Sequence, residues 1–102
     1  MTTYSDIFDS NTQHITSGSY SSATKTLSIT FANDLNPSQA AAAVLQSITN
    51  FLVSNQDQTI NLAAQAPTRN TSLRNGLPKD QINYSIQIYT PPSQVLFNPS
   101  DI

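Results

Sequence analysis

The chain has 102 residues, of which 10% are charged, and its formal net charge is −2 at pH 7. This length suits one domain with a single hydrophobic core. Four basic residues cannot neutralise many phosphates, so the composition excludes an extended nucleic-acid-binding surface. The chain has no cysteine and therefore no disulfide and no thiolate ligand.

The composition and the first residues also bear on localisation. No apolar run approaches the ~20 residues of a membrane-spanning helix. The N-terminal stretch MTTYSDIFDS lacks the basic and apolar regions of a secretory signal. We therefore expect a soluble, cytoplasmic protein without membrane contact.

Two apolar arms are predicted at the ends of the chain, at residues 1–12 and 91–102. Prolines in the second arm prevent a regular strand or helix there. The arms are expected to cover the edges of their own sheet, to bind a neighbouring subunit or to stay disordered. The candidate oligomer contacts are Tyr4, Ile7, Phe8, Val95, Leu96 and Phe97.

A hairpin is predicted after the first arm. Its first strand runs from Ile15 to Tyr20 and turns through residues 21–24 into the stretch KTLSITF, residues 25–31. This second stretch alternates apolar and polar residues, as a strand with one buried face does.

The clearest predicted element is a helix of about 18 residues that starts after Asn36. Asn36 is a suitable N-cap, Pro37 suits the first helical position, and Gln39 completes a capping box. We expect Asn55 to end the helix in a left-handed conformation. The spacing predicts an apolar face of Ala41, Val44, Leu45, Ile48, Phe51 and Leu52, and a polar side that includes Gln39, Gln46, Thr49 and Asn50.

Two more strands are predicted in the C-terminal half, at TINLAAQA (residues 59–66) and QINYSIQIYT (residues 81–90). The second has an apolar face of Ile82, Tyr84, Ile86 and Ile88. The fold class is therefore α+β, in the order β-β-α-β-β. We expect one domain over residues 1–102, a two-layer sandwich in which one long helix covers a four-stranded antiparallel sheet of order 1-2-4-3.

Between these strands, residues 67–80 hold three of the four basic residues and only one Asp. Pro67 and Pro78 bound a stretch that is long for a hairpin connection, so we expect an exposed loop. The Asn75-Gly76 turn signal would fold this loop back on itself. Its cations either keep it solvated or contact an anion or an acidic partner through Arg69, Arg74 and Lys79.

Several chemistries lack their residues. Gly18 and Gly76 are the only glycines, so no phosphate-binding loop is present. A single His14 without cysteine does not make a zinc site. Asp6, Asp9 and His14 have no diagnostic catalytic spacing, and we interpret them as solvated surface residues. We expect no catalytic residues, no metal and no cofactor.

These observations favour a non-enzymatic interaction or assembly module that self-associates as a homo-oligomer and meets an acidic partner surface through the arginine-rich loop. The alternative is a small anionic-ligand binding protein, or an enzyme, that uses Arg69 and Arg74 in a pocket at the sheet edge.

Overall fold

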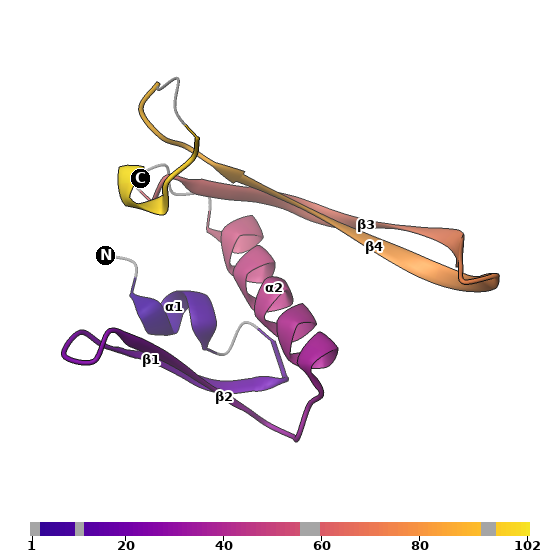
Figure 1. Ribbon diagram of the computed structural model, residues 1–102, viewed down its shortest axis with the longest axis horizontal. Coiled ribbons are helices and arrows are strands. Elements are labelled where there is room, and N and C mark those ends of the chain that lie inside the picture. Colours follow the sequence, from indigo (N-terminus) through magenta and orange to yellow (C-terminus); the bar gives the residue numbers. More distant parts are fainter. Residues whose placement is uncertain (1–2, 10–11, 56–59, 93–95) are drawn as a thin grey trace.

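The computed structural model describes residues 3–9, 12–55, 60–92 and 96–102. The fold is α+β, and the four strands and the long helix follow the predicted order β-β-α-β-β (Figure 1). The elements are α1 (Tyr4–Phe8), β1 (Ile15–Ser21), β2 (Thr26–Phe31), α2 (Pro37–Ser54), β3 (Leu62–Arg74), β4 (Leu77–Ile88) and the short 3-10 helix η2 (Pro99–Asp101).

Helix α2 begins as the sequence predicts. The Gln39 N–H donates to Asn36 Oδ1 at 2.8 Å, and the Asn36 N–H donates to Gln39 Oε1 at 3.0 Å, which completes the capping box. The end differs from the expectation, because Asn55 is extended (φ −128°) and not left-handed. Its backbone N–H and its side-chain amide both donate to the Phe51 carbonyl at 2.9 Å, so Asn55 satisfies a terminal carbonyl without a left-handed residue.

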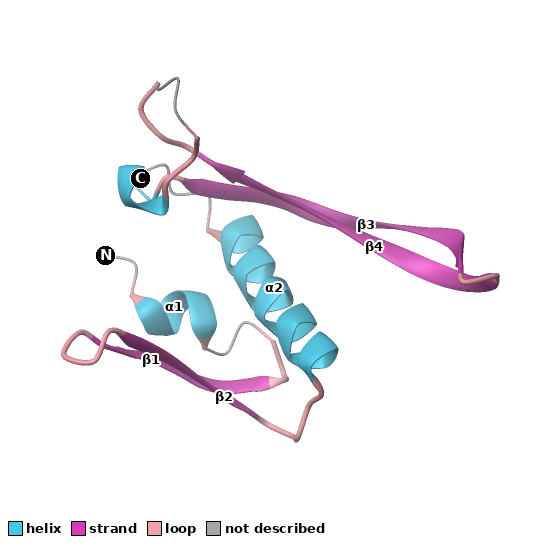
Figure 2. Ribbon diagram, in the orientation of Figure 1, coloured by secondary structure: helices cyan, strands magenta, loops and turns pink. Residues whose placement is uncertain are grey.

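The four strands form two separate two-stranded antiparallel sheets, β1-β2 and β3-β4. The expected single sheet of order 1-2-4-3 is therefore corrected. Figures 1 and 2 show the helices between the two hairpins, so the hairpins lie on different sides of α2. A single sheet would require both hairpins on the same side of the helix.

Helix α2 has buried side chains on more than one side, which explains this separation. The fully buried Ser47 hydroxyl donates to the Ile7 carbonyl of the N-terminal segment at 2.7 Å. Leu52, which the helical turn places on a different side from Ser47, forms the main hydrophobic cluster with Phe51 and with Ala64 of β3, and Ile86 of β4 packs against it. A helix covered from two sides cannot show the single apolar face that a two-layer sandwich requires.

The burial along α2 departs from the predicted pattern at specific residues. Thr49, assigned to the polar side, is fully buried, whereas Leu45, assigned to the core, is 46% exposed. Ala41 is also exposed, and the small Ala43 is buried. The apolar stripe therefore points to the core only along the C-terminal half of the helix.

The N-terminal residues pack on their own chain. Helix α1 lies on β1, close enough that the buried Gly18 leaves no space for a Cβ beside Phe8. Tyr4 stacks on Tyr20 with ring centroids 4.6 Å apart. Of the alternatives for this arm, the structure shows contact with its own chain for residues 4–8. In the described residues, no helix is long and apolar enough to cross a membrane.

The predicted loop at residues 67–80 is wrong. Strand β3 continues to Arg74, β4 begins at Leu77, and only Asn75 and Gly76 lie between them. Pro67 falls at an irregularity in the register between Gln65 and Thr68. The strands tolerate both prolines because each strand of a two-stranded sheet has one unpaired edge.

Candidate interaction surface

The most distinctive feature of the fold is the long hairpin of β3 and β4, which projects from the rest of the molecule (Figure 1). We call residues 65–83 of this hairpin the arm, and from here on we call the two terminal stretches, residues 1–12 and 91–102, the tails. Every residue of the arm is exposed except Ser72, which is half-buried. The hairpin base is different, because Ala64 is buried in the hydrophobic cluster and Ile86 packs against that cluster.

The tip of the arm is closed by a two-residue turn. Asn75 (φ 54°) and Gly76 (φ 78°) are both left-handed, as the central residues of a type I′ turn are. This turn matches the right-handed twist of the flanking strands. The Asn-Gly signal therefore closes a regular hairpin, in place of the long loop that the prolines suggested.

The register assigns each arm residue to one of two faces, because residues opposite each other in a sheet share a face. On β4, Ile82 and Ile86 are four residues apart, and this even spacing places them on the same face. Ile86 packs against the core, so this face is the inner one. The inner face comprises the pairs Arg69/Ile82, Thr71/Asp80 and Leu73/Pro78, and the outer face comprises Thr68/Asn83, Asn70/Gln81, Ser72/Lys79 and Arg74/Leu77.

The outer face is polar, and its side chains bond to one another. Asn83 donates to Asn70 Oδ1 at 2.9 Å, and Gln81 donates to Asn83 Oδ1 at 2.9 Å. The Ser72 hydroxyl donates to Gln81 Oε1 at 3.4 Å. This row of hydrogen-bonded side chains faces solvent, where water satisfies the remaining donors and acceptors.

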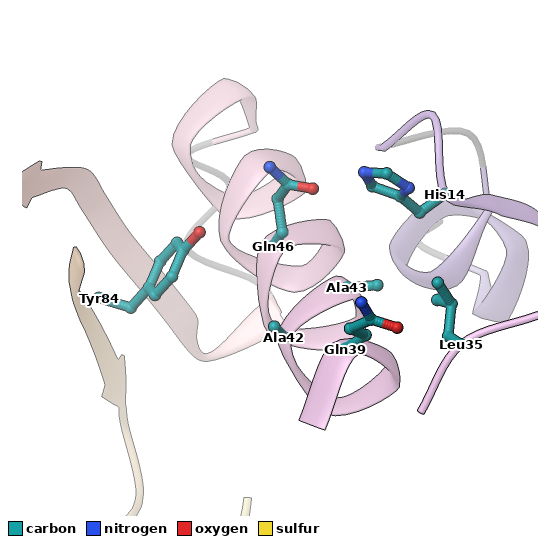
Figure 3. Close-up of a pocket in the computed structure, with 7 residues that line it drawn as sticks. All are labelled: His14, Leu35, Gln39, Ala42, Ala43, Gln46 and Tyr84. Carbon is teal, nitrogen blue, oxygen red and sulfur yellow. The ribbon is translucent and has the colours of Figure 1, made fainter. Parts of the chain in front are cut away.

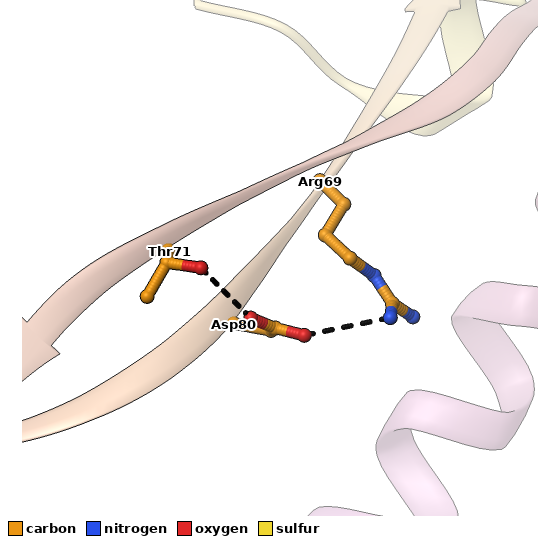
Figure 4. A network of polar contacts seen from close by, with 3 residues as sticks. All are labelled: Arg69, Thr71 and Asp80. Carbon is orange, nitrogen blue, oxygen red and sulfur yellow. Dashed lines mark hydrogen bonds and ion pairs between the residues drawn. The ribbon is translucent and has the colours of Figure 1, made fainter.

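The inner face combines apolar residues with one self-contained polar group (Figure 4). Asp80 accepts a hydrogen bond from Thr71 at 3.0 Å and forms an ion pair with Arg69 at 3.4 Å. Both charged side chains are more than half exposed, so the pair contributes little to stability but neutralises the charge of this face. Leu73, towards the tip, is 75% exposed.

The structure distributes the three predicted cations over both faces of the arm. Arg69 lies on the inner face beside Asp80, whereas Arg74 and Lys79 lie on the outer face near the tip. Arg74 and Lys79 also line a shallow depression of about 480 Å³ together with Ser72, Leu73, Asp80 and Gln81. The tip thus brings Arg74 and Lys79 together and separates them from Arg69.

The residues proposed as oligomer contacts in the two tails have different environments. Ile7 packs against the hydrophobic cluster, Phe8 is half-buried, and Tyr4 stacks on Tyr20. At the C-terminus, Leu96 is 92% exposed and Phe97 is also exposed. Val95 lies outside the described residues.

A cavity of about 270 Å³ lies where the hairpin faces α2. Figure 3 shows Tyr84 of β4 on one side of the helix and His14 with Leu35 on the other, with the remaining lining residues on α2. Gln46, in this lining, accepts a hydrogen bond from the Thr12 hydroxyl at 2.6 Å. Within the described residues, no group of His, Asp or Glu side chains is arranged to hold a metal ion.

Sequence reasoning missed the exposed apolar residues of this region. The sequence assigns Leu45 to the core and places Leu73 in the expected loop at residues 67–80. The signal for Leu73 was its position two residues before an Asn-Gly turn, which places it in a strand when the turn closes a hairpin. No comparable local signal marks Leu45.

Comparison with protein-family models, curated proteins and solved structures found no match to this chain. The candidate function therefore depends on the geometry of the arm, the helix and the exposed C-terminal segment.

Proposed function

We propose that this protein is a non-enzymatic assembly module that associates with further copies of itself. The observation that carries this proposal is its accessible surface of 7697 Å². A compact monomer of this mass exposes roughly 5,700 Å² by the usual scaling of surface with mass. The chain thus exposes about 2,000 Å² more surface than a compact fold of its mass would.

The dimensions and the core support the same proposal. The radius of gyration is 15.7 Å, whereas a compact domain of this length has one of about 13 Å. Among the residues that the structure describes, the main buried cluster consists of Phe51, Leu52 and Ala64, with partly buried residues around it. A core of this size leaves much apolar surface uncovered, and association would cover it.

The uncovered surface includes large apolar side chains on the arm, on α2 and in the C-terminal segment. A stable interface of standard size buries about 800 Å² on each partner, which is less than the excess surface of this chain. The exposed large apolar residues include Leu45, Leu73, Leu77, Ile82, Ile88, Tyr89, Leu96, Phe97 and Ile102.

Charge supports association between copies. Residues 69–80 carry three basic side chains and one Asp, whereas the rest of the chain carries one Lys and five Asp. The arm of one copy is therefore attracted to the acidic body of another. The acidic partner surface predicted from the sequence is, in this proposal, a second copy of the same chain.

Light scattering after size-exclusion chromatography tests this proposal. We expect a mass of two or more chains at micromolar concentration. Because surface charges assist the encounter, the association should weaken as salt concentration rises. A strict monomer at high micromolar concentration and low salt would contradict the proposal.

A further inference from the structure

Two apolar faces of this chain are more exposed at greater distance from the core. One is on α2, towards its N-terminus, and the other is the inner face of the hairpin, towards its tip. On α2, Leu52 and Ile48 pack in or against the core. Leu45 and Ala41 continue the same helix face by i, i+3 and i+4 spacing, but both are exposed. The described part of the chain therefore covers the N-terminal half of this face only in part.

The inner face of the hairpin shows the same change. Ile86 packs against the core, Tyr84 is half-buried, and Ile82 is 38% exposed. Further towards the tip, Leu73 is 75% exposed. Figure 1 shows the reason, since the arm and α2 meet near the C-terminal end of the helix and diverge from there.

We propose that the inner face of the arm packs on the partly covered N-terminal half of α2 in a second copy, and that the two copies do this reciprocally. The inference rests on the proposed self-association and names the surface that performs it. A two-fold arrangement covers both faces of both chains at once, since each copy supplies one arm and one helix face.

The second copy suits these faces because of their charge and because of the surface that is available. The inner face is apolar around an Arg69–Asp80 pair that already neutralises itself, so covering it buries no unpaired charge. Arg74 and Lys79 lie on the outer face and stay in solvent, where they attract the acidic body of the partner. The excess surface of about 2,000 Å² on each copy is large enough for a permanent dimer interface.

A pair of leucines at the tip of the arm provides the test. Leu73 is on the inner face and Leu77, also exposed, is on the outer face, four positions away across the same turn. Leu73→Asp should weaken association by roughly tenfold or more, as the loss of a central apolar contact does. Leu77→Asp introduces the same charge at the same tip, opposite Arg74, so it reports the electrostatic part of the effect. It should weaken association several-fold less than Leu73→Asp does, because Leu77 lies outside the proposed contact. Sedimentation velocity over a concentration series measures the dissociation constant of each variant.

Leu45→Asp on α2 tests the other half of the interface. It should weaken association as Leu73→Asp does, because the proposed contact joins these two surfaces. Circular dichroism and thermal melting of each variant report its folding. If Leu45→Asp unfolds the chain, the Leu73 and Leu77 pair alone decides, because both residues are exposed and far from the core.

The outcomes separate this inference from the proposed function. If the unchanged protein is a monomer, both fail. If it associates and Leu73→Asp associates equally well, or Leu77→Asp weakens association as much, the arm-on-helix contact is overturned and self-association stands. Loss of association in Leu96→Asp, with Leu73→Asp unaffected, would place the interface in the C-terminal segment.

Discussion

Replacing Gly18 with alanine should destabilise the protein, although alanine is the better residue for a strand. Gly18 is buried in β1 beneath α1. A Cβ added there would lie 2.6 Å from Phe8 Cβ and 2.9 Å from the Phe8 carbonyl oxygen. Both distances are shorter than ordinary van der Waals contact, so α1 or β1 must move.

Two effects of opposite sign determine how much Gly18→Ala changes the free energy of unfolding. Alanine in a strand interior gains about 0.5–1 kcal/mol over glycine, because the unfolded glycine has more conformational freedom. Overpacking a closely packed site costs about 1–3 kcal/mol. Moving α1 away does not avoid the cost, since it strains the hydrogen bonds from Ser5 to the Gly18 carbonyl and from Ser47 to the Ile7 carbonyl. We expect a net loss of about 1–2 kcal/mol.

Thermal denaturation followed by circular dichroism measures this loss. A change of 1 kcal/mol lowers the Tm of a domain of this size by about 4–8 °C. Ser19→Ala, at the neighbouring exposed position of β1, is the matched control and should change the Tm little. Phe8→Ala in the Gly18→Ala background should not restore stability, because the Phe8 Cβ and carbonyl remain. A Gly18→Ala protein as stable as the original would refute the close packing of α1 on β1.

Three further substitutions test other parts of the fold. Thr49 is fully buried, and its hydroxyl makes no hydrogen bond within the described part of the chain. Thr49→Val should therefore raise the free energy of unfolding by about 1 kcal/mol. An unfolding midpoint in urea below that of the original protein would contradict this expectation. Asn36→Ala removes the N-cap of α2 and should cost about 1 kcal/mol, whereas Ser38→Ala, in the exposed first turn, is the control for the same urea titration. Gly76→Ala places a side chain at φ 78° and should lower the free energy of unfolding of the hairpin by about 1–2 kcal/mol. Amide hydrogen exchange should accelerate in the arm and not in α2. Unchanged exchange near the turn would show that the turn is not left-handed.

The elements themselves were largely predictable from the sequence. The capping box of Asn36 and Gln39, the alternation in β2 and β4, and the Asn-Gly turn each depend on residues a few positions apart. The candidate surface was predictable only in part. Residues 69–80 were identified by their charge. Their division between two faces depends on the pairing of β3 with β4, and a loop was expected where this pairing occurs.

Pattern alone could not predict what covers each face of α2. Ser47 and Thr49 are polar by residue type, yet both are fully buried. Ser47 is buried because the N-terminal segment brings the Ile7 carbonyl within reach of its hydroxyl. Leu45 is apolar, yet it is exposed. Figure 1 shows that the arm diverges from α2 towards the N-terminal end of the helix.

The sequence by itself determined the α+β class, the limits of α2 and the existence of two hairpins, because local hydrogen bonds and side-chain periodicity specify these features. Only the tertiary structure decided that the hairpins lie on different sides of α2, and that one of them extends as a free arm. Contacts between residues far apart in the chain decide which apolar surfaces meet, and no local pattern records them.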